Sequence, residues 1–130
     1  MPKVEKSTPP GTPVPIGPYS HIAKVGQNIT IGGVAGFDPA TGALAGPDIA
    51  SQTRQILDSF RVMLQSVDSD LDHVVHINVF MADMAEFDEM NRAYAEVMGE
   101  PGPARTAVQV AALPKPGLRL TMNLTAVTKD

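Results

Sequence analysis

A stripe of apolar side chains between residues 47 and 67 constrains the fold more than any other feature of the sequence. Its members recur at the spacing of one helical face, and polar residues such as Gln52 and Arg54 fill the other positions. The stripe consists of Ile49, Thr53, Ile56, Leu57, Phe60, Met63, Leu64 and Val67. Pro47 suits the first turn of a helix. We therefore expect a helix over residues 47–67 that packs this stripe against a core.

The segments on either side of this helix have the composition and spacing of β-strands. Residues 22–31 form two short apolar runs around Gly26-Gln27-Asn28, which is typical of two strands joined by a turn. Residues 72–81 are rich in β-branched side chains, and residues 106–111 form a further strand-like run. From 118 to 127 apolar and polar residues alternate strictly, which indicates a strand with one buried face.

A second helix is expected after Asp83. Asp83 precedes Glu86 by three positions, as the two residues of a capping box do, and Gly99 is suited to end the helix. The apolar face of this helix consists of Phe87, Met90, Tyr94 and Val97. The order β-β-α-β-α-β-β predicts an α+β fold, a mixed sheet with two helices on one face. Because the other face also needs cover, we expect an oligomer.

The chain has 130 residues, which suits one domain over residues 1–130 with a single core. Residues 1–16 form a proline-rich arm with no obvious core of its own. No segment resembles a secretory signal or a membrane span.

The chain has no cysteine, which excludes disulfides and thiolate chemistry and fits a reducing compartment, so we expect a cytoplasmic protein. The net charge is −4 and the ten Lys and Arg form no cluster, which argues against nucleic-acid binding.

Histidines, glycines and serines offer no metal or nucleophile site. His73 and His76 are expected three residues apart on one strand, so their side chains point to opposite faces, and His21 stands alone. The glycine-rich segment 32–36 lacks the Lys-Ser/Thr of a phosphate loop and opens no helix, although such glycines allow a ligand to approach closely. No Gly-x-Ser-x-Gly motif is present, and a helix start explains the carboxylates between 83 and 89.

Arg105 is the residue whose position calls for a charged partner. It follows Pro103-Ala104 and begins an otherwise apolar strand, with no further basic residue before Lys115. An arginine that enters a core strand needs an anion or a wet pocket, and its planar fork matches a carboxylate through two hydrogen bonds. A structural salt bridge, or a surface arginine whose stem lies on apolar side chains, are the alternatives.

Seven short segments, spread over nearly the whole chain, resemble the RidA/YjgF family. They are Gly17-Pro18-Tyr19-Ser20, Phe37-Asp38-Pro39-Ala40-Thr41-Gly42, Gln52-Thr53, Asp72 with Val74-Val75, Phe87-Asp88-Glu89-Met90-Asn91-Arg92-Ala93-Tyr94, Pro103-Ala104-Arg105-Thr106-Ala107-Val108 and Leu113-Pro114-Lys115. The resemblance implies a chorismate-mutase-like fold and a homotrimer with its sites in the clefts between subunits. It also implies hydrolysis of reactive enamines and imines of 2-keto acids, with release of ammonia and without metal or organic cofactor.

The resemblance assigns roles to particular residues. In the family an arginine holds the substrate carboxylate, while a tyrosine, an asparagine and a serine near the glycines line the pocket. Arg105, Tyr19 and Asn91 keep the first three of these residue types. Gly32 stands at the serine position, and Ala107 stands two residues after the arginine, where a cysteine is frequent. Together these five residues form the expected substrate-binding set.

The family's glutamate on the last strand, which helps a water attack the imine carbon, is missing. Counting back from the C-terminus its position falls on Thr121, and counting forward from Leu113-Pro114-Lys115 it falls on Leu120. The alternation favours Thr121, which lies on the polar face. Thr121 and Arg105 are therefore the expected catalytic residues, although threonine orients a water but is a poor base at neutral pH. Either an electrophilic imine hydrolyses more slowly with the help of the arginine alone, or the base comes from another chain or from the substrate itself.

Three functions follow from this pattern. The first is a hydrolytic deaminase of small imino and enamine acids, with Arg105 as the carboxylate anchor. The second is a non-catalytic trimer that binds small carboxylates or keto acids, which the missing glutamate favours. The third is an endoribonuclease or translation inhibitor, activities also attached to the family's name, against which the acidic charge weighs.

Overall fold

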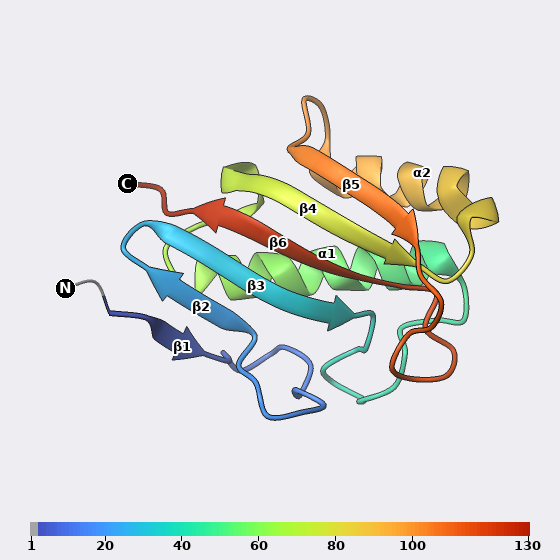
Figure 1. Ribbon diagram of the computed structural model, residues 1–130, viewed down its shortest axis with the longest axis horizontal. Helices are drawn as coiled ribbons and strands as arrows, with labels where there is room; N and C mark the ends of the chain where they lie inside the picture. Colours follow the sequence, from blue (N-terminus) through green and yellow to red (C-terminus); the bar gives the residue numbers. More distant parts are fainter. Residues whose placement is uncertain (1–2) are drawn as a thin grey trace.

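The computed structural model describes residues 3–130, so Met1 and Pro2 of the expected arm lie outside the described part. Six strands form one sheet in the spatial order β1-β2-β3-β6-β4-β5, in which β4 and β5 are parallel and the other neighbours antiparallel (Figure 1). The strands are β1 (Glu5–Ser7), β2 (Ile22–Val25), β3 (Asn28–Ala35), β4 (Val74–Met81), β5 (Ala104–Gln109) and β6 (Leu120–Val127). The expected mixed α+β sheet is confirmed.

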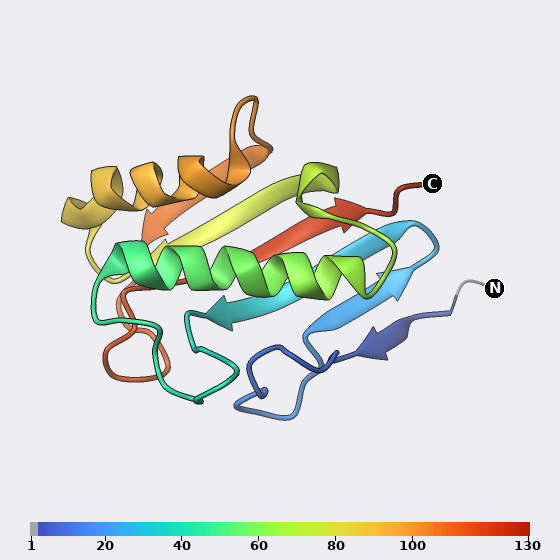
Figure 2. The ribbon, with the colours of Figure 1, turned by 180° about the vertical axis from the view of Figure 1, so that it is seen from behind.

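Two helices, α1 (Ile49–Gln65) and α2 (Phe87–Met98), lie side by side on one face of the sheet (Figure 2). Asp48 caps α1 by accepting a hydrogen bond from the backbone N–H of Ser51 at 2.9 Å. The apolar stripe of α1 lies in the core, where Ile49, Ile56, Leu57, Phe60, Met63 and Leu64 are fully buried. The expected helix is confirmed, with ends two residues shorter on each side. No helix among residues 3–130 has the length and apolar character needed to span a bilayer.

Gln52 was expected on the polar cover of α1 but is fully buried. At this end of the helix, loops rather than solvent lie against the side chain. Its amide nitrogen donates to the carbonyls of Gly46 and Gly117, at 3.0 and 3.1 Å. A helical wheel shows which face is polar but not which loops will cover it, so the sequence pattern alone could not reveal this burial.

The N-terminal arm adds a strand that the sequence pattern did not predict. Glu5–Ser7 pairs with the edge of β2, so the order gains one strand to become β-β-β-α-β-α-β-β. All three residues of β1 are exposed, which explains why no apolar alternation marks it. The strand forms because β2 offers an unpaired edge, a tertiary cause that local sequence does not carry.

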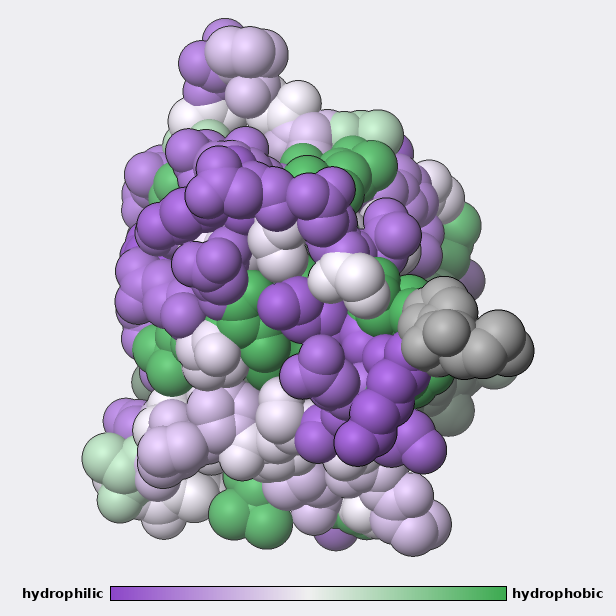
Figure 3. All heavy atoms as spheres, turned by 90° about the vertical axis from the view of Figure 1, so that its left-hand side faces the viewer, coloured by the Kyte–Doolittle hydropathy of each residue, from purple (hydrophilic) through white to green (hydrophobic). Residues whose placement is uncertain are grey.

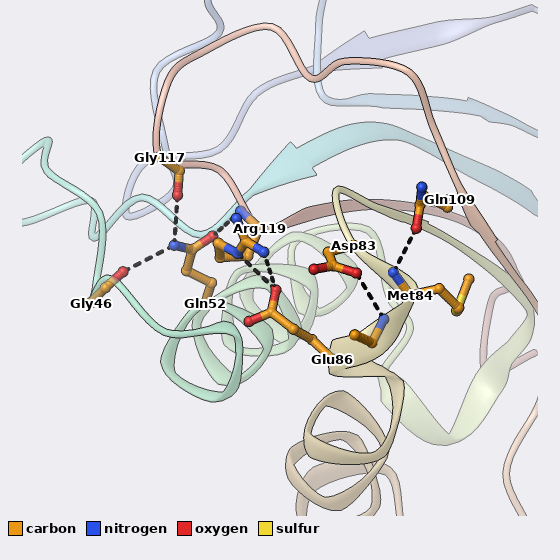
Figure 4. A network of polar contacts seen from close by, with 9 residues as sticks. Gly46, Gln52, Asp83, Met84, Glu86, Gln109, Gly117 and Arg119 are labelled. Atoms are coloured by element: carbon orange, nitrogen blue, oxygen red, sulfur yellow. Dashed lines mark hydrogen bonds and ion pairs between the residues drawn. The ribbon is translucent and has the colours of Figure 1, made fainter.

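Two further expectations were wrong in detail. Asp83 caps a separate turn of 3-10 helix, η2 (Met84–Glu86), rather than α2, and Glu86 makes no capping contact (Figure 4). His73 belongs to another such turn, η1 (Leu71–His73), and not to the strand that holds His76. Both short turns are local adjustments at the ends of β4, which hydrophobic periodicity does not resolve.

The other face of the sheet carries no helix and is turned toward the viewer in Figure 1. Polar pairs cross it: Nδ2 of Asn78 donates to Oδ1 of Asn123 at 2.9 Å, and Nε2 of His76 lies 3.0 Å from the hydroxyl of Thr106. This surface is called the open face below. Its cover by an oligomer partner remains a prediction. The end of the molecule near both chain termini is largely hydrophilic (Figure 3).

Candidate functional site

A concave pocket of about 540 Å³ lies where β3 and β6 meet the N-terminal arm. It is called the arm pocket below. Its lining includes Tyr19, Gly32 and Thr121, three of the residues selected by the family resemblance. A second cavity of about 420 Å³ adjoins it and shares a wall with it. The shared wall consists of Pro13, Val14, Ile16 and Phe37.

The alternation of β6 decides which residue reaches the arm pocket. Leu120 and Met122 are fully buried beneath the helices, so Thr121 between them faces the open side, where it lines the pocket. Leu120 therefore belongs to the core. On β3 the register shifts between Ile31 and Val34, a bulge that places Gly32 and Gly33 in the pocket wall.

His21, which stands alone in the sequence and was not expected in a site, lies in the wall of the arm pocket. It is 3% exposed, and its Nε2 lies 2.5 Å from the carbonyl oxygen of Pro13. A carbonyl only accepts, so Nε2 carries the hydrogen. Nδ1 is buried and has no hydrogen-bond partner among residues 3–130. The bond to Pro13 holds the arm against the sheet, and no local pattern in the sequence indicates this contact.

Arg105 lies elsewhere, on the helix side of β5. Its guanidinium carbon stands 4.8 Å from the ring centre of Tyr94 and 5.6 Å from that of Phe87, both on α2. Nη1 also approaches the sulfur of Met90 at 3.9 Å. Aromatic faces attract a cation and fix the guanidinium plane without neutralising its charge.

No carboxylate among residues 3–130 pairs with Arg105, whereas Arg54, Arg61 and Arg119 each form an ion pair. The Tyr94 hydroxyl beside it is buried without a hydrogen-bond partner, and burial raises its pKa. A partly buried cation held by rings and free of an acid is prepared to take an anion from outside the chain. The structural salt bridge considered for Arg105 is therefore absent from the described chain.

Ala107 and Asn91 accompany Arg105. Ala107 follows it by two residues on β5 and thus shares its face, and it lines a shallow cavity of about 470 Å³ next to Phe87. Asn91 lies one turn after Phe87 on α2 and is partly buried, so it is a neighbour of that ring. Arg105, Ala107 and Asn91 therefore gather at the junction of β5 and α2, which is called the arginine half-site below.

Comparison with known proteins supports one family. A family model described as Endoribonuclease L-PSP matches residues 10–128. A RutC family protein of Pyrococcus horikoshii is 44% identical over 103 residues, 79% of this chain and 82% of the relative. The human 2-iminobutanoate/2-iminopropanoate deaminase is 36% identical over 115 residues, 88% of this chain and 83% of the relative. The crystal structure of RidA from an Antarctic Psychrobacter matches with a TM-score of 0.89 and 32% identity, covering 95% of this chain and 98% of that one.

The chain belongs to the RidA/YjgF family. Its relatives include proteins named as reactive-intermediate and imine deaminases. The expected family membership and fold are thus confirmed.

This RidA/YjgF member keeps its two groups of site residues apart within one chain. Arg105 on β5 pairs with Ile77 of β4, while Thr121 on β6 pairs with Phe80 of β4. The two residues lie on opposite sides of β4 and are offset by three residues along it. Their Cα atoms are therefore about 14 Å apart. Ile77 is fully buried under the helices, so Arg105 and Thr121 also point to opposite faces. One chain alone does not bring the arginine to the arm pocket.

A polar network holds the loop that precedes β6 in this family member (Figure 4). Gln52 Oε1 accepts the backbone N–H of Arg119 at 2.8 Å, in addition to its two bonds to Gly46 and Gly117. The Arg119 side chain in turn pairs with Glu86, with Nε 2.7 Å from Oε1. The network ties α1, η2 and two loops together and so fixes the part of the pocket wall that this loop supplies.

The pocket lacks a carboxylate of its own. None of the residues that line the arm pocket is Asp or Glu, and Asp38 of the adjoining cavity accepts the N–H of Ala40 in a turn. Among residues 3–130, no three His, Asp or Glu side chains gather closely enough to hold a metal ion. The arrangement offers a cation without an acid partner in the described chain, a hydroxyl from Thr121 and an apolar wall.

Proposed function

We propose that the chain is a hydrolytic deaminase of small 2-imino and enamine acids, of the 2-aminoacrylate and 2-iminopropanoate type, which it converts to 2-keto acids and ammonia. The observation that carries the proposal is Arg105, a partly buried cation stacked on two rings with no acid beside it in the described chain. The imine deaminases among the relatives support the same reaction.

The proposed reaction uses the substrate's own electrophilicity. Arg105 holds the carboxylate through two charge-assisted hydrogen bonds and thereby fixes the position of the imine carbon. A water oriented by the Thr121 hydroxyl adds to that carbon, and the water's proton passes to the imine nitrogen, directly or through another water. The hydroxyl proton of the resulting carbinolamine then moves to its amino nitrogen through water, the C–N bond breaks as the C=O bond forms, and the products are the keto acid and ammonia. No cofactor enters this scheme.

We further propose that the complete site forms between subunits of a homotrimer. The arginine half-site of one subunit meets the arm pocket of the next, which brings Arg105, Asn91 and Ala107 to Tyr19, Gly32 and Thr121. The separation of about 14 Å and the opposite faces within one chain support this arrangement, because only a second copy can join the two. The open face offers the surface on which such copies would pack.

The test compares ammonia release from freshly generated 2-iminopropanoate, corrected for spontaneous hydrolysis, across four proteins. Arg105→Ala loses two charge-assisted bonds, so we expect kcat/KM to fall by about 10²-fold or more. Thr121→Glu supplies a base and is expected to raise kcat. Arg61→Ala, an exposed α1 arginine paired with Asp58, is the matched control and is expected to leave the rate unchanged. Wild-type release equal to the spontaneous rate for several imino acids would refute the deaminase.

A non-catalytic carboxylate binder is the second candidate, and the absence of a carboxylate from the arm pocket favours it. In that case 2-ketobutyrate raises the thermal midpoint of the wild type but not of Arg105→Ala, and no imine is turned over. Ribonuclease activity, which the description of the family model mentions, is not part of the proposal because the Lys and Arg residues form no basic cluster.

A further inference from the structure

We infer that Glu86 is a positioning residue of the proposed deaminase, and that its ion pair with Arg119 keeps the arginine half-site and the arm pocket of one chain in a fixed relation. The inference rests on the proposed function and adds to it two residues that the family resemblance did not select. Neither side chain lines the arm pocket or the cavity beside Ala107, so both act through their neighbours.

The ion pair connects segments that adjoin the two half-sites. Glu86 directly precedes Phe87, whose ring centre lies 5.6 Å from the Arg105 guanidinium carbon. Arg119 directly precedes β6 and lies two residues before Thr121. Nε and Nη2 of Arg119 both donate to Oε1 of Glu86, with Nε at 2.7 Å. Each partner of the pair is therefore no more than two residues from a side chain that belongs to a half-site or contacts one.

The backbone on each side of the ion pair is itself anchored (Figure 4). The N–H of Arg119 donates to Oε1 of Gln52 at 2.8 Å, and its carbonyl accepts the N–H of Ala82 at 2.9 Å. On the other side, the N–H of Met84 donates to Oε1 of Gln109 at 2.8 Å, which ties η2 to the end of β5. The pair thus joins two fixed segments and not two loose loops.

Partial burial distinguishes this ion pair from the other pair that joins two elements of the fold. The side chains of Arg119 and Glu86 are 32% and 26% exposed, whereas those of Arg54 and Glu96, which join α1 to α2, are 49% and 57% exposed. Exposed pairs are screened by water and salt and restrain little. A less exposed pair with two charge-assisted hydrogen bonds restrains both partners more strongly.

Loss of the ion pair affects both half-sites of a chain. A shift of η2 moves the Phe87 ring and loosens the Arg105 guanidinium, which weakens carboxylate binding. A shift at the start of β6 moves the Thr121 hydroxyl and the water that it orients, which lowers kcat. A misplacement of about 1 Å costs about 10²-fold in rate. Because the backbone bonds on each side remain, we expect a loss of about tenfold.

The experiment is a double-mutant cycle of Glu86→Gln and Arg119→Gln. It measures kcat for 2-iminopropanoate, corrected for spontaneous hydrolysis, the dissociation constant of 2-ketobutyrate, and the thermal midpoint. Each single variant is expected to lower kcat about tenfold and to weaken 2-ketobutyrate binding several-fold. The double variant should be no worse than either single variant, because the second replacement finds the pair already broken. The cycle of Arg54→Gln and Glu96→Gln is the matched control and should leave kcat and affinity within about twofold.

The readouts separate positioning from a merely structural role. Rates are measured far below each thermal midpoint, where a structural role leaves kcat and affinity at their wild-type values. If the wild type is active and Glu86→Gln equals it in both, the inference is overturned and the deaminase stands. Additive losses in the cycle, or equal losses in the control cycle, also overturn it. A wild type at the spontaneous rate refutes the deaminase and the inference together.

Arg119→Lys decides the question if either glutamine variant does not fold. Lysine keeps the positive charge but replaces the two donors of the guanidinium by one nitrogen. We expect a folded protein whose kcat lies between those of the wild type and of a variant without the pair, about threefold below the wild type. A wild-type kcat in folded Arg119→Lys would then overturn the inference.

Discussion

Replacing Gln52 by methionine keeps the shape of a fully buried side chain and removes its three hydrogen bonds. Those bonds join α1 to the carbonyls of Gly46 and Gly117 and to the backbone N–H of Arg119. The loop before β6 then loses its tie to the helix. We expect a less stable protein with a more mobile pocket wall.

The structure sets the size of the loss. Each intramolecular hydrogen bond contributes about 1 kcal/mol net, so the three contribute about 3 kcal/mol. The greater hydrophobicity of methionine returns about 1 kcal/mol. Gly117 is exposed and Gly46 is partly exposed, so water reaches the carbonyls that Gln52 leaves, and no large penalty for unpaired groups is added. The free energy of unfolding should fall by about 2 kcal/mol, and the thermal midpoint by roughly 8 °C.

Urea denaturation at one fixed protein concentration measures this difference, because assembly would otherwise shift the apparent stability. The matched control is Gln65→Met on the same helix, where an exposed glutamine makes a single bond to Asp70. We expect the control to change the free energy of unfolding by less than about 0.5 kcal/mol. The reasoning is refuted if Gln52→Met and Gln65→Met have equal effects with unchanged m-values.

Two further predictions concern the arginine half-site and the start of α1. Tyr94→Leu removes the ring whose centre lies 4.8 Å from the Arg105 guanidinium carbon, and we expect it to weaken 2-ketobutyrate binding about tenfold. Tyr94→Phe keeps the ring and should keep most of the affinity. Calorimetry measures both affinities, and equal values for the two variants would contradict a role for the ring. Hydrogen bonds from the Ser51 N–H and hydroxyl hold the pKa of Asp48 below its ordinary 3.8, so its contribution to stability is present above that value and is lost as pH falls through the folded pKa. Asp48→Asn does not titrate, so urea midpoints of wild type and variant should converge as pH falls below 3.8, and a constant difference would contradict the assignment.

Elements with a strong period could be predicted from the sequence. The stripe on α1 and the alternation on β6 repeat over several turns or pairs, so each position adds to the same signal. Elements created by distant contacts could not be predicted in this way. β1 exists because β2 has a free edge, and Glu86 serves Arg119, 33 residues away, rather than the nearby helix start. Local patterns carry no information about such partners.

The candidate site shows the same division. Arg105 could be selected because a lone cation in an apolar strand conflicts with burial. Thr121 was indicated by the family resemblance, and the alternation of its strand decided between it and Leu120. Their placement on opposite faces follows from the pairing of β4 with both β5 and β6, which the sequence does not state. His21 is an isolated histidine in the sequence, and only the fold of the arm brings its ring to the Pro13 carbonyl and into the pocket wall.

The start of the first strand, β1, and the end of the last strand, β6, lie at one level of the sheet, with β2 and β3 between them. Glu5 pairs with Lys24, Lys24 with Ile29 and Ile29 with Ala126, so three strand spacings, or about 14 Å, separate the first strand from the last. About five extended residues across the hydrophilic end seen in Figure 3 would bridge that distance. We expect such closure, with new ends opened at Gly102 in an exposed loop, to give a circular permutant with the same strand pairing. Strand pairing, rather than the order in which the strands follow one another along the chain, would then specify this fold.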